Sequence, residues 1–244
     1  MNLTVPISFF DSFPVSCGTT TRHFPLKIAN SQQLAQQDGR SLAQQLLNLE
    51  TKGWVQAGQI HGAAVTVLDG QQNRSSSVTV LKDTDGLITQ TPNQLLSVVT
   101  ADCLPIFFYL ENPPSIGLVH AGWRGTARWI VRNAVSLFQS RFNMSPRELY
   151  VAFGPSIGGC CYEVGSEVRD LFSESLEERQ SRLYLDLVKE NGRQLLEAGV
   201  RPQRIGPAGP CCGCHLNDFY SYRKEGDGAY RMLSWITLSN LPKL

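Results

Sequence analysis

Three residues that can bind a metal ion stand at the ends of short apolar segments. His61 precedes the segment AAVTVL, Cys103 precedes the apolar run LPIFFYL, and His120 ends the segment SIGLVH. Each stands beside small or turn-forming residues, so loops can bring the three side chains together. Two imidazoles and one thiolate give zinc three ligands and leave the fourth tetrahedral position for water, as in catalytic zinc sites. The alternative is a buried cysteine with two ordinary histidines.

Asp102 comes directly before Cys103 in the segment TADC. A carboxylate beside a metal ligand most simply orients a ligand histidine or the metal-bound water. Direct acid–base catalysis is the other interpretation, although the alternation of side chains along a strand would point Asp102 away from Cys103.

Two glycines flank Trp123 and Arg124 in the segment GWRGT, just before an expected helix. Backbone N–H groups at the start of that helix and the Arg124 guanidinium could together bind an anion such as phosphate. Trp123 could stack on a purine. The alternative is a glycine-rich turn with a surface arginine and a tryptophan that covers the core.

The remaining cysteines raise a second question about metal. We interpret Cys160 and Cys161, in GPSIGGCCYEVG, as packed thiols rather than nucleophiles. The segment GPCCGCH suggests a second metal site through Cys211, Cys214 and His215. A single C-x-x-C without a partner pair is weak support for such a site, so we favour a structural role. Free cysteines, together with an N-terminus unlike a secretory signal, predict a protein of the reducing cytoplasm.

The elements that must position these residues are read from hydrophobic periodicity. Strands are expected over 63–68, 77–81, 95–100, 104–110, 116–120 and 149–155. Helices are expected over 31–49, from about 126 to 142, over 167–179 and over 187–200. The second of these helices, which begins near 126, should bury one face, made of Ile130, Ala134, Leu137 and Phe138. No repeat or long linker divides the chain, so we expect one α+β domain over residues 1–244.

Composition and charge exclude two classes of partner. The 244 residues carry a net charge of +1, with basic and acidic residues interspersed. A nucleic-acid-binding protein would show a broad basic patch. The longest apolar run is near seven residues, whereas a membrane helix needs roughly 20. We therefore expect small solutes as partners, and neither nucleic acid nor membrane.

Seven motifs occur in the order in which the YfiH/YlmD-like family has them. They are GQIH, DGLIT, TADCLPIFF, VHAGWRGTA, GPSIGGCCYEVG, LDLVKENGRQLLEAGV and CHLNDFYSYRKEG. The chain resembles this family over about residues 59–226. Its bacterial members were first called polyphenol oxidases or laccases and later purine nucleoside phosphorylases. The resemblance implies sandwich-like mixed sheets flanked by helices, similar to the fold of cytotoxic necrotizing factor-like cysteine hydrolases.

The resemblance also implies roles for individual residues. It places the zinc ligands at His61, Cys103 and His120, with copper as a less favoured metal. Catalytic roles would fall to Cys103, Asp102 and Arg124. The expected contacts to the substrate are Arg22, Gln59, Trp123 and Arg124. Near Arg22 the chain keeps only the Thr-Arg part of the family's TRxGGVS segment.

The implied reaction is phosphorolysis of adenosine, inosine or related nucleosides, methylthioadenosine among them, with purine nucleoside and phosphate as partners. Adenosine deamination, with zinc activating the attacking water, is implied as well. The alternatives are a hydrolase using Cys103 and His120, an editing hydrolase for a peptidoglycan precursor, and a non-enzymic zinc-storage or redox module. A laccase is disfavoured, because four coppers require about ten histidines and the chain has four.

Overall fold

The apolar run after Cys103 forms strand β8 (Leu104–Leu110), in which every residue is buried. Side chains alternate between the two faces of a strand, and here the two faces enter different cores. Ile106 and Phe108 pack on one side, and Phe107 and Tyr109 pack on the other. Because both faces are covered, the run has no polar position.

Two mixed sheets build the centre of the fold. One has six strands in the order β1-β2-β14-β7-β3-β5, and the other has five in the order β10-β8-β9-β6-β4. The first sheet comprises β1 (Thr4–Pro6), β2 (Val15–Thr20), β3 (Gly53–Ala57), β5 (Thr79–Leu81), β7 (Gln94–Thr100) and β14 (Met232–Leu238). The second comprises β4 (Val65–Val67), β6 (Gly86–Thr89), β8, β9 (Ser115–Ala121) and β10 (Tyr150–Phe153). The computed structural model describes residues 2–70, 77–172 and 174–239.

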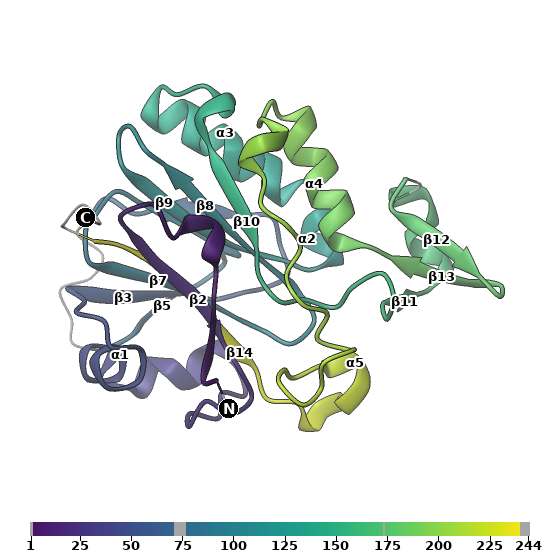
Figure 1. The fold of residues 1–244 in the computed structure, drawn as a ribbon, viewed down its shortest axis with the longest axis horizontal. Coiled ribbons are helices and arrows are strands. Elements are labelled where there is room, and N and C mark those ends of the chain that lie inside the picture. Colours follow the sequence, from purple (N-terminus) through teal and green to yellow (C-terminus); the bar gives the residue numbers. More distant parts are fainter. Residues whose placement is uncertain (1, 71–76, 173, 240–244) are drawn as a thin grey trace.

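The two sheets stack face to face, and helices cover their outer faces (Figure 1). One core lies between the sheets and contains Val55 and Ile236 of the first and Leu118 of the second. Helix α1 (Gly39–Leu47) packs on the six-stranded sheet, and α3 (Ile130–Phe142) packs on the five-stranded one. The other helices are α2 (Trp123–Ala127), α4 (Leu187–Glu197) and α5 (Tyr222–Glu225), with short 3₁₀ helices at Ser8–Phe10, Ser31–Gln36, Pro146–Glu148, Ser166–Leu171, Pro202–Arg204 and Gly226–Gly228.

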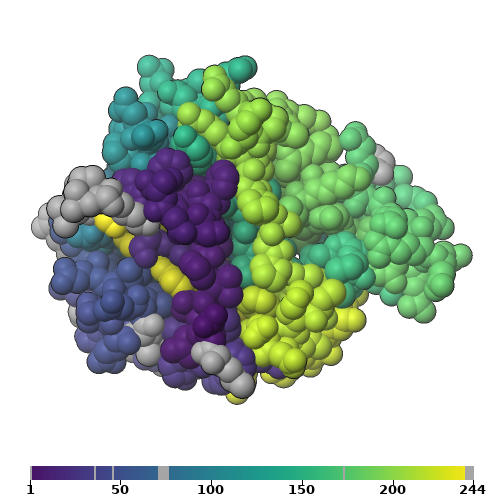
Figure 2. All heavy atoms as spheres, in the orientation of Figure 1, coloured from purple at the N-terminus to yellow at the C-terminus, as the bar shows by residue number. Residues whose placement is uncertain are grey.

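This arrangement confirms the predicted α+β class with mixed sheets flanked by helices. The likeness to the cysteine hydrolase fold stays a prediction, as does the assignment of all of 1–244 to one domain. No helix in the described ranges combines the length and the apolar character that crossing a membrane requires. Figure 2 shows the N-terminal segment lying along the surface beside β14, in agreement with the pairing of β2 with β14.

The segment 167–179 is not the helix expected from its sequence. It forms a 3₁₀ helix and then β12 (Leu176–Arg179), which pairs with β13 (Arg182–Leu185) and lies in a three-stranded sheet with β11 (Glu163–Val164). The two residues between β12 and β13 both have positive φ, as in the tight turns that join hairpin strands. That hairpin projects from the side of the molecule (Figure 1).

The helix expected over 31–49 is divided in two. Its first part is the 3₁₀ helix Ser31–Gln36, and α1 begins only after Asp38, whose side chain accepts the backbone N–H groups of Arg40 and Ser41. An aspartate in this position starts a new helix by satisfying N–H groups that lack a partner. Strands β4 and β5, expected around one polar loop, belong to different sheets, and most of that loop (71–76) lies outside the described residues.

The expected buried face of α3 is confirmed. Ile130, Ala134 and Phe138 are fully buried, and Leu137 is partly buried against the same core. The ring of Phe138 lies over Gly117 of β9, 3.1 Å from the point where a Cβ would stand at that residue.

We predict that Phe138→Ala lowers the free energy of unfolding by about 3–5 kcal/mol, because it leaves a cavity between α3 and the sheet. The neighbouring Gln139 is exposed, and Gln139→Ala should change that free energy by no more than about 0.5 kcal/mol. Chemical denaturation of both variants measures the difference. Equal losses would contradict the packing of α3.

Candidate metal and substrate site

The expected metal ligands lie together because the ends of neighbouring strands meet. Strands β8 and β9 are antiparallel, with Pro105 opposite His120. Cys103, just before β8, therefore lies next to His120 near the end of β9. His61 arrives on the loop before β4. The side-chain nitrogen and sulfur atoms of His61, Cys103 and His120 all lie within 4.8 Å of one another.

The three donors leave room for one metal ion. His120 is buried, Cys103 is half-buried and His61 is exposed, so the group opens to solvent on the His61 side. The two imidazole rings are nearly perpendicular, at 85°, with centroids 4.9 Å apart. A Cβ at Gly122 would stand 3.0 Å from Cys103 Sγ and 3.4 Å from His61 Cδ2. Glycine at position 122 therefore keeps the space between the ligands free.

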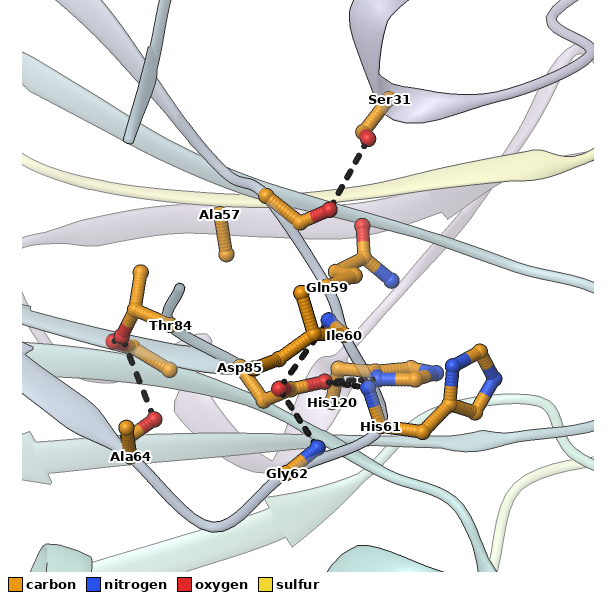
Figure 3. A network of polar contacts seen from close by, with 12 residues as sticks. Ser31, Ala57, Gln59, Ile60, His61, Gly62, Ala64, Thr84, Asp85 and His120 are labelled. Atoms are coloured by element: carbon orange, nitrogen blue, oxygen red, sulfur yellow. Dashed lines mark hydrogen bonds and ion pairs between the residues drawn. The ribbon is translucent and has the colours of Figure 1, made fainter. Parts of the chain in front are cut away.

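A buried carboxylate that the sequence analysis did not single out holds two of these ligands in place. Asp85 Oδ1 lies 2.9 Å from His120 Nδ1, and the carboxylate accepts the backbone N–H groups of residues 60–62 at 2.8–3.2 Å (Figure 3). The bond at Nδ1 leaves Nε2 of His120 for a metal. Asp85, and not Asp102, thus orients His120, whereas an orienting role of Asp102 toward a metal-bound water stays a prediction.

The loop before β4 adopts an uncommon backbone to reach Asp85. Gln59 and His61 have φ of 59° and 58°, in the left-handed region that non-glycine residues rarely occupy. This conformation directs successive N–H groups at one carboxylate. Burial alone would raise the pKa of Asp85, but the hydrogen bonds from His120 and from the backbone of Gly62 and His61 outweigh it and lower the pKa. Asp85 is thus ionised and holds the loop.

Without a metal, Cys103 and His120 form a charged pair. Burial alone would raise the pKa of Cys103, but the charge of His120 and hydrogen bonds from His120 and His61 lower it to about 6. Burial would lower the pKa of His120, but the charge of Cys103 and the hydrogen bond to Asp85 raise it to about 9. The thiolate, which is the form that binds a metal, is therefore favoured at neutral pH.

Asp102 lines the same cavity as the ligands without contacting either histidine through a hydrogen bond. It lies in a bend before β8 with φ of 89°, so the expected strand alternation does not point it away from Cys103. Its Oδ2 accepts the backbone N–H of Arg223 at 2.7 Å, and its Oδ1 is buried with no hydrogen-bond partner among the described residues. Burial raises the pKa of this carboxyl, and the backbone N–H and charge of Arg223 oppose that rise.

A cavity of about 640 Å³ lies over the three ligands, a size typical of small-molecule sites. Arg124 stacks on the ring of Trp123 at 4.4 Å, and Arg223 lies 5.4 Å from the ring of Tyr162. Within residues 2–70, 77–172 and 174–239, neither guanidinium has a hydrogen bond or ion pair to the protein. The lining arginines are Arg124, Arg223 and Arg231, and the lining aromatic residues are Trp123, Tyr162 and Tyr222. The cavity thus offers cations for an anion and flat faces for a ring.

Two of the expected substrate contacts are occupied by other interactions. Gln59 lines the cavity, but its side-chain amide donates to the carbonyl of Val99 at 2.6 Å and accepts the N–H of Val99 at 2.8 Å. Arg22 does not line the cavity. It forms an ion pair with Glu225 and stacks on the ring of Tyr220.

Trp123 and Arg124 lie inside a short helix rather than before one. Helix α2 begins at Trp123 and has five residues. The helix start expected near 126 therefore falls inside α2. Helix α4 holds α2 in place, because Asn191 and Gln194 each donate at 3.0 Å to Thr126, one to its hydroxyl and the other to its carbonyl. Both amides are buried, which explains the polar residues on this face of α4.

The residues that were missed all stand within recognised motifs. Asp85 begins DGLIT, Tyr162 belongs to GPSIGGCCYEVG, and Arg223 belongs to CHLNDFYSYRKEG. These motifs carry the family resemblance, but the sequence alone did not indicate a chemical role for these three side chains.

Known proteins with similar sequences carry one shared name. The chain is 37% identical to "Purine nucleoside phosphorylase YlmD" of Geobacillus stearothermophilus, over 75% of this chain and 71% of that protein. It is 33% identical to the protein of the same name from Bacillus subtilis, over 78% and 73%.

Two solved structures share the fold. The hypothetical protein YfiH of Bacillus licheniformis has a TM-score of 0.85 at 27% identity, covering 98% of this chain and 97% of its own. YlmD of Geobacillus stearothermophilus has a TM-score of 0.81 at 32% identity, covering 93% of each chain. Residues 25–239 match the model of a family described as multi-copper polyphenol oxidoreductase laccase. By that match and by these relatives, the chain belongs to the family, which is the YfiH/YlmD-like family that its motifs resemble.

Proposed function

We propose that the protein is a zinc-dependent purine nucleoside phosphorylase. Phosphate would displace the purine from C1′ of adenosine, inosine, methylthioadenosine or a related nucleoside, giving the free base and the 1-phosphate of the sugar. The observation that carries the proposal is one cavity that joins a three-donor group to the guanidinium groups of Arg124 and Arg223, which have no hydrogen bond or ion pair among the described residues. The relatives named as purine nucleoside phosphorylases support the reaction.

Zinc fits the donor set. His61, Cys103 and His120 would hold the ion by two imidazoles and a thiolate, with one position left open. When bound, zinc supplies Lewis-acid chemistry toward a substrate oxygen. A single copper ion is the alternative occupant. Several coppers are not supported, because the chain has four histidines and only two of them belong to this group within the described residues.

The chain's own side chains would then divide the work. Arg124 and Arg223 would bind phosphate oxygens by charge-assisted hydrogen bonds. The aromatic faces of Trp123 and Tyr162 suit a purine ring. Asp102 would hold a proton at Oδ1 and give it to the departing purine nitrogen, a role for which a raised pKa is suited.

Adenosine deamination is a second candidate reaction. The observation that favours it is the unpartnered carboxyl of Asp102 beside an open three-donor group. Zinc deaminases use a carboxyl that is not a metal ligand to move protons during attack at C6 of adenine. This reaction needs no phosphate, so Arg124 would contribute little to it.

A cysteine hydrolase remains the competing class, with an editing hydrolase for a peptidoglycan precursor as one form of it. The charged pair of Cys103 and His120 favours it, because a thiolate beside an imidazolium is a nucleophile. His61 argues for the metal, since a Cys-His pair does not need a third donor within 4.8 Å.

Our first functional prediction concerns phosphate. Arg124→Ala should raise the KM for phosphate about 10- to 100-fold, as expected for about 1.5–3 kcal/mol from one charge-assisted hydrogen bond. Adenosine deamination should change little. A product assay on a nucleoside panel, with and without phosphate and with the metal quantified, measures both reactions. Arg128→Ala is the matched control, because Arg128 is exposed on the same stretch of chain and does not line this cavity. Equal loss of both reactions in Arg124→Ala would indicate a structural role.

A second prediction separates the two carboxylates. Asp102→Asn should lower kcat for phosphorolysis at least about 100-fold by removing the acid, with metal content unchanged. Asp85→Asn should instead weaken metal binding by about 10- to 100-fold, because His120 loses its orienting partner. Metal titration and kinetics on both variants test this pairing. Metal loss in Asp102→Asn, or full metal affinity in Asp85→Asn, would reverse the assigned roles.

A third prediction uses the pKa of Cys103. In metal-free protein the lowered pKa means that the thiolate forms as pH rises through about 6, so Cys103 alkylation should rise over that range. His120→Asn should shift this rise toward the ordinary thiol pKa, because the positive charge is lost. Peptide mass spectrometry after timed alkylation reads Cys103 alone.

Zinc should suppress the alkylation of Cys103 and restore nucleoside turnover together, and His61→Ala should behave like the metal-free protein. Full turnover in chelated protein, with Cys103 already reactive, would replace the zinc enzyme by the cysteine hydrolase.

A further inference from the structure

Four cysteines outside the proposed active site meet at one point. Cys160 and Cys161 lie on the loop before β11, and Cys211 and Cys214 lie on the loop before α5. Their sulfur atoms are all within 4.8 Å of one another. Cys160 Sγ lies 3.9 Å from Cys161 Sγ, 3.6 Å from Cys211 Sγ and 3.5 Å from Cys214 Sγ, and Cys161 Sγ lies 3.5 Å from Cys214 Sγ. The partner pair that the lone C-x-x-C lacked in the sequence is thus the adjacent pair Cys160-Cys161.

These distances are those of ligands around a single ion. Zinc–sulfur bonds of 2.3 Å in a tetrahedron place the sulfur atoms about 3.8 Å apart. The four distances above, 3.5–3.9 Å, surround that value. A cluster of several irons would hold its cysteines farther apart, because the irons and inorganic sulfides stand between them.

We propose that Cys160, Cys161, Cys211 and Cys214 form a second metal site, which binds one zinc ion by four thiolates. The four thiols lose their protons to solvent as the ion binds. His215, considered earlier as a ligand, is not one of the group, and its Nδ1 contacts the carbonyl of Cys211 at 3.0 Å.

Cys212 is also excluded from the group of four. Its side chain is fully buried in a separate core with Phe219 and Tyr220. Only the first and last cysteines of Cys211–Cys214 face the other loop, as expected when a C-x-x-C turn binds a metal.

Both loops are shaped around the sulfur atoms. The backbone N–H of Gly158 donates to Cys211 Sγ at 3.2 Å, a contact that stabilises a thiolate. A Cβ at Gly213 would stand 3.0 Å from Cys161 Cβ and 3.1 Å from its Sγ. Glycine at 213 thus lets the second loop approach the first closely. Lys224 Cε lies 3.6 Å from the point where that Cβ would stand, so the Lys224 side chain packs against the same loop.

The site would fix two segments of the substrate cavity. Tyr162, which lines the cavity, directly follows Cys161, and Arg223, which holds Asp102, lies on the helix after Cys214. These segments otherwise meet through a few backbone contacts, among them the bond from Cys212 N–H to the Ser156 carbonyl at 2.9 Å. A closed tetrahedral site leaves no position for substrate, so we assign it a structural role. This inference does not depend on the proposed reaction.

The test counts metal in full-length protein purified anaerobically with reductant. In a His61→Ala/His120→Ala background, which removes the first site, we expect one zinc per chain. Adding Cys160→Ser/Cys214→Ser should remove it, whereas adding Cys17→Ser should not, because Cys17 lies apart in the core between the sheets. Cobalt in place of zinc should show sulfur-to-metal absorption of four thiolates rather than one.

A second measurement needs no substitution of the four cysteines, so it does not depend on whether the cysteine variants fold. The protein carries the histidine background and all of its cysteines. Zinc should protect four cysteines from alkylation, namely Cys160, Cys161, Cys211 and Cys214. A chelator should make all four reactive and lower the midpoint of thermal unfolding. Iron in place of zinc, two disulfides, or four free thiols that take up no zinc would each overturn the proposal. If wild-type protein holds one zinc per chain, as the histidine background does, that result would count against the metal of the proposed active site and not against the four-cysteine site.

Discussion

The geometry of the candidate active site depends on one buried carboxylate. Asp85 accepts hydrogen bonds from the backbone of residues 60–62 and from His120, and its own carbonyl accepts the His120 N–H at 2.7 Å. A buried charge is costly unless donors surround it, so the carboxylate and its donors hold one another in a single arrangement. That arrangement sets the direction of the His120 imidazole and the backbone position of His61. Without Asp85, the left-handed backbone at Gln59 and His61 would lose the contacts that maintain it.

The candidate metal ligands and the charged and aromatic residues that line the cavity come from different parts of the fold. Cys103 and His120 lie at the ends of β8 and β9, which are buried on both faces and paired over seven residues. Such strands keep attached side chains in place. The cations and aromatic rings of the cavity come from α2, α5 and loops, where substitutions disturb packing less.

The sequence was sufficient for features that depend on residue type and short spacing. The buried run of β8 and the buried face of α3 are of this kind. The grouping of His61, Cys103 and His120 was anticipated from their places at strand ends and from the family motifs, and their role as metal ligands stays a prediction. The sequence was not sufficient where long-range pairing decides. An Asp-Gly pair reads as a turn, and only the sheet shows that Asp85 points inward. Cys161 and Cys211 are 50 positions apart and meet because Ser156 and Cys211 form a bridge between segments. The segment 167–179 has helical periodicity, but a hairpin turn after Arg179 directs it into a strand.

The two cysteine-containing groups would give a bound zinc ion different net charges. Zinc with two neutral imidazoles and one thiolate carries a net positive charge and an open position, so it can still polarise a substrate oxygen. Zinc with four thiolates carries a net negative charge and no open position. The first suits an anionic substrate such as phosphate, and the second would repel it. A closed site behind Tyr162 and Arg223 would therefore stiffen the wall of the cavity without competing for the phosphate that we propose Arg124 and Arg223 bind.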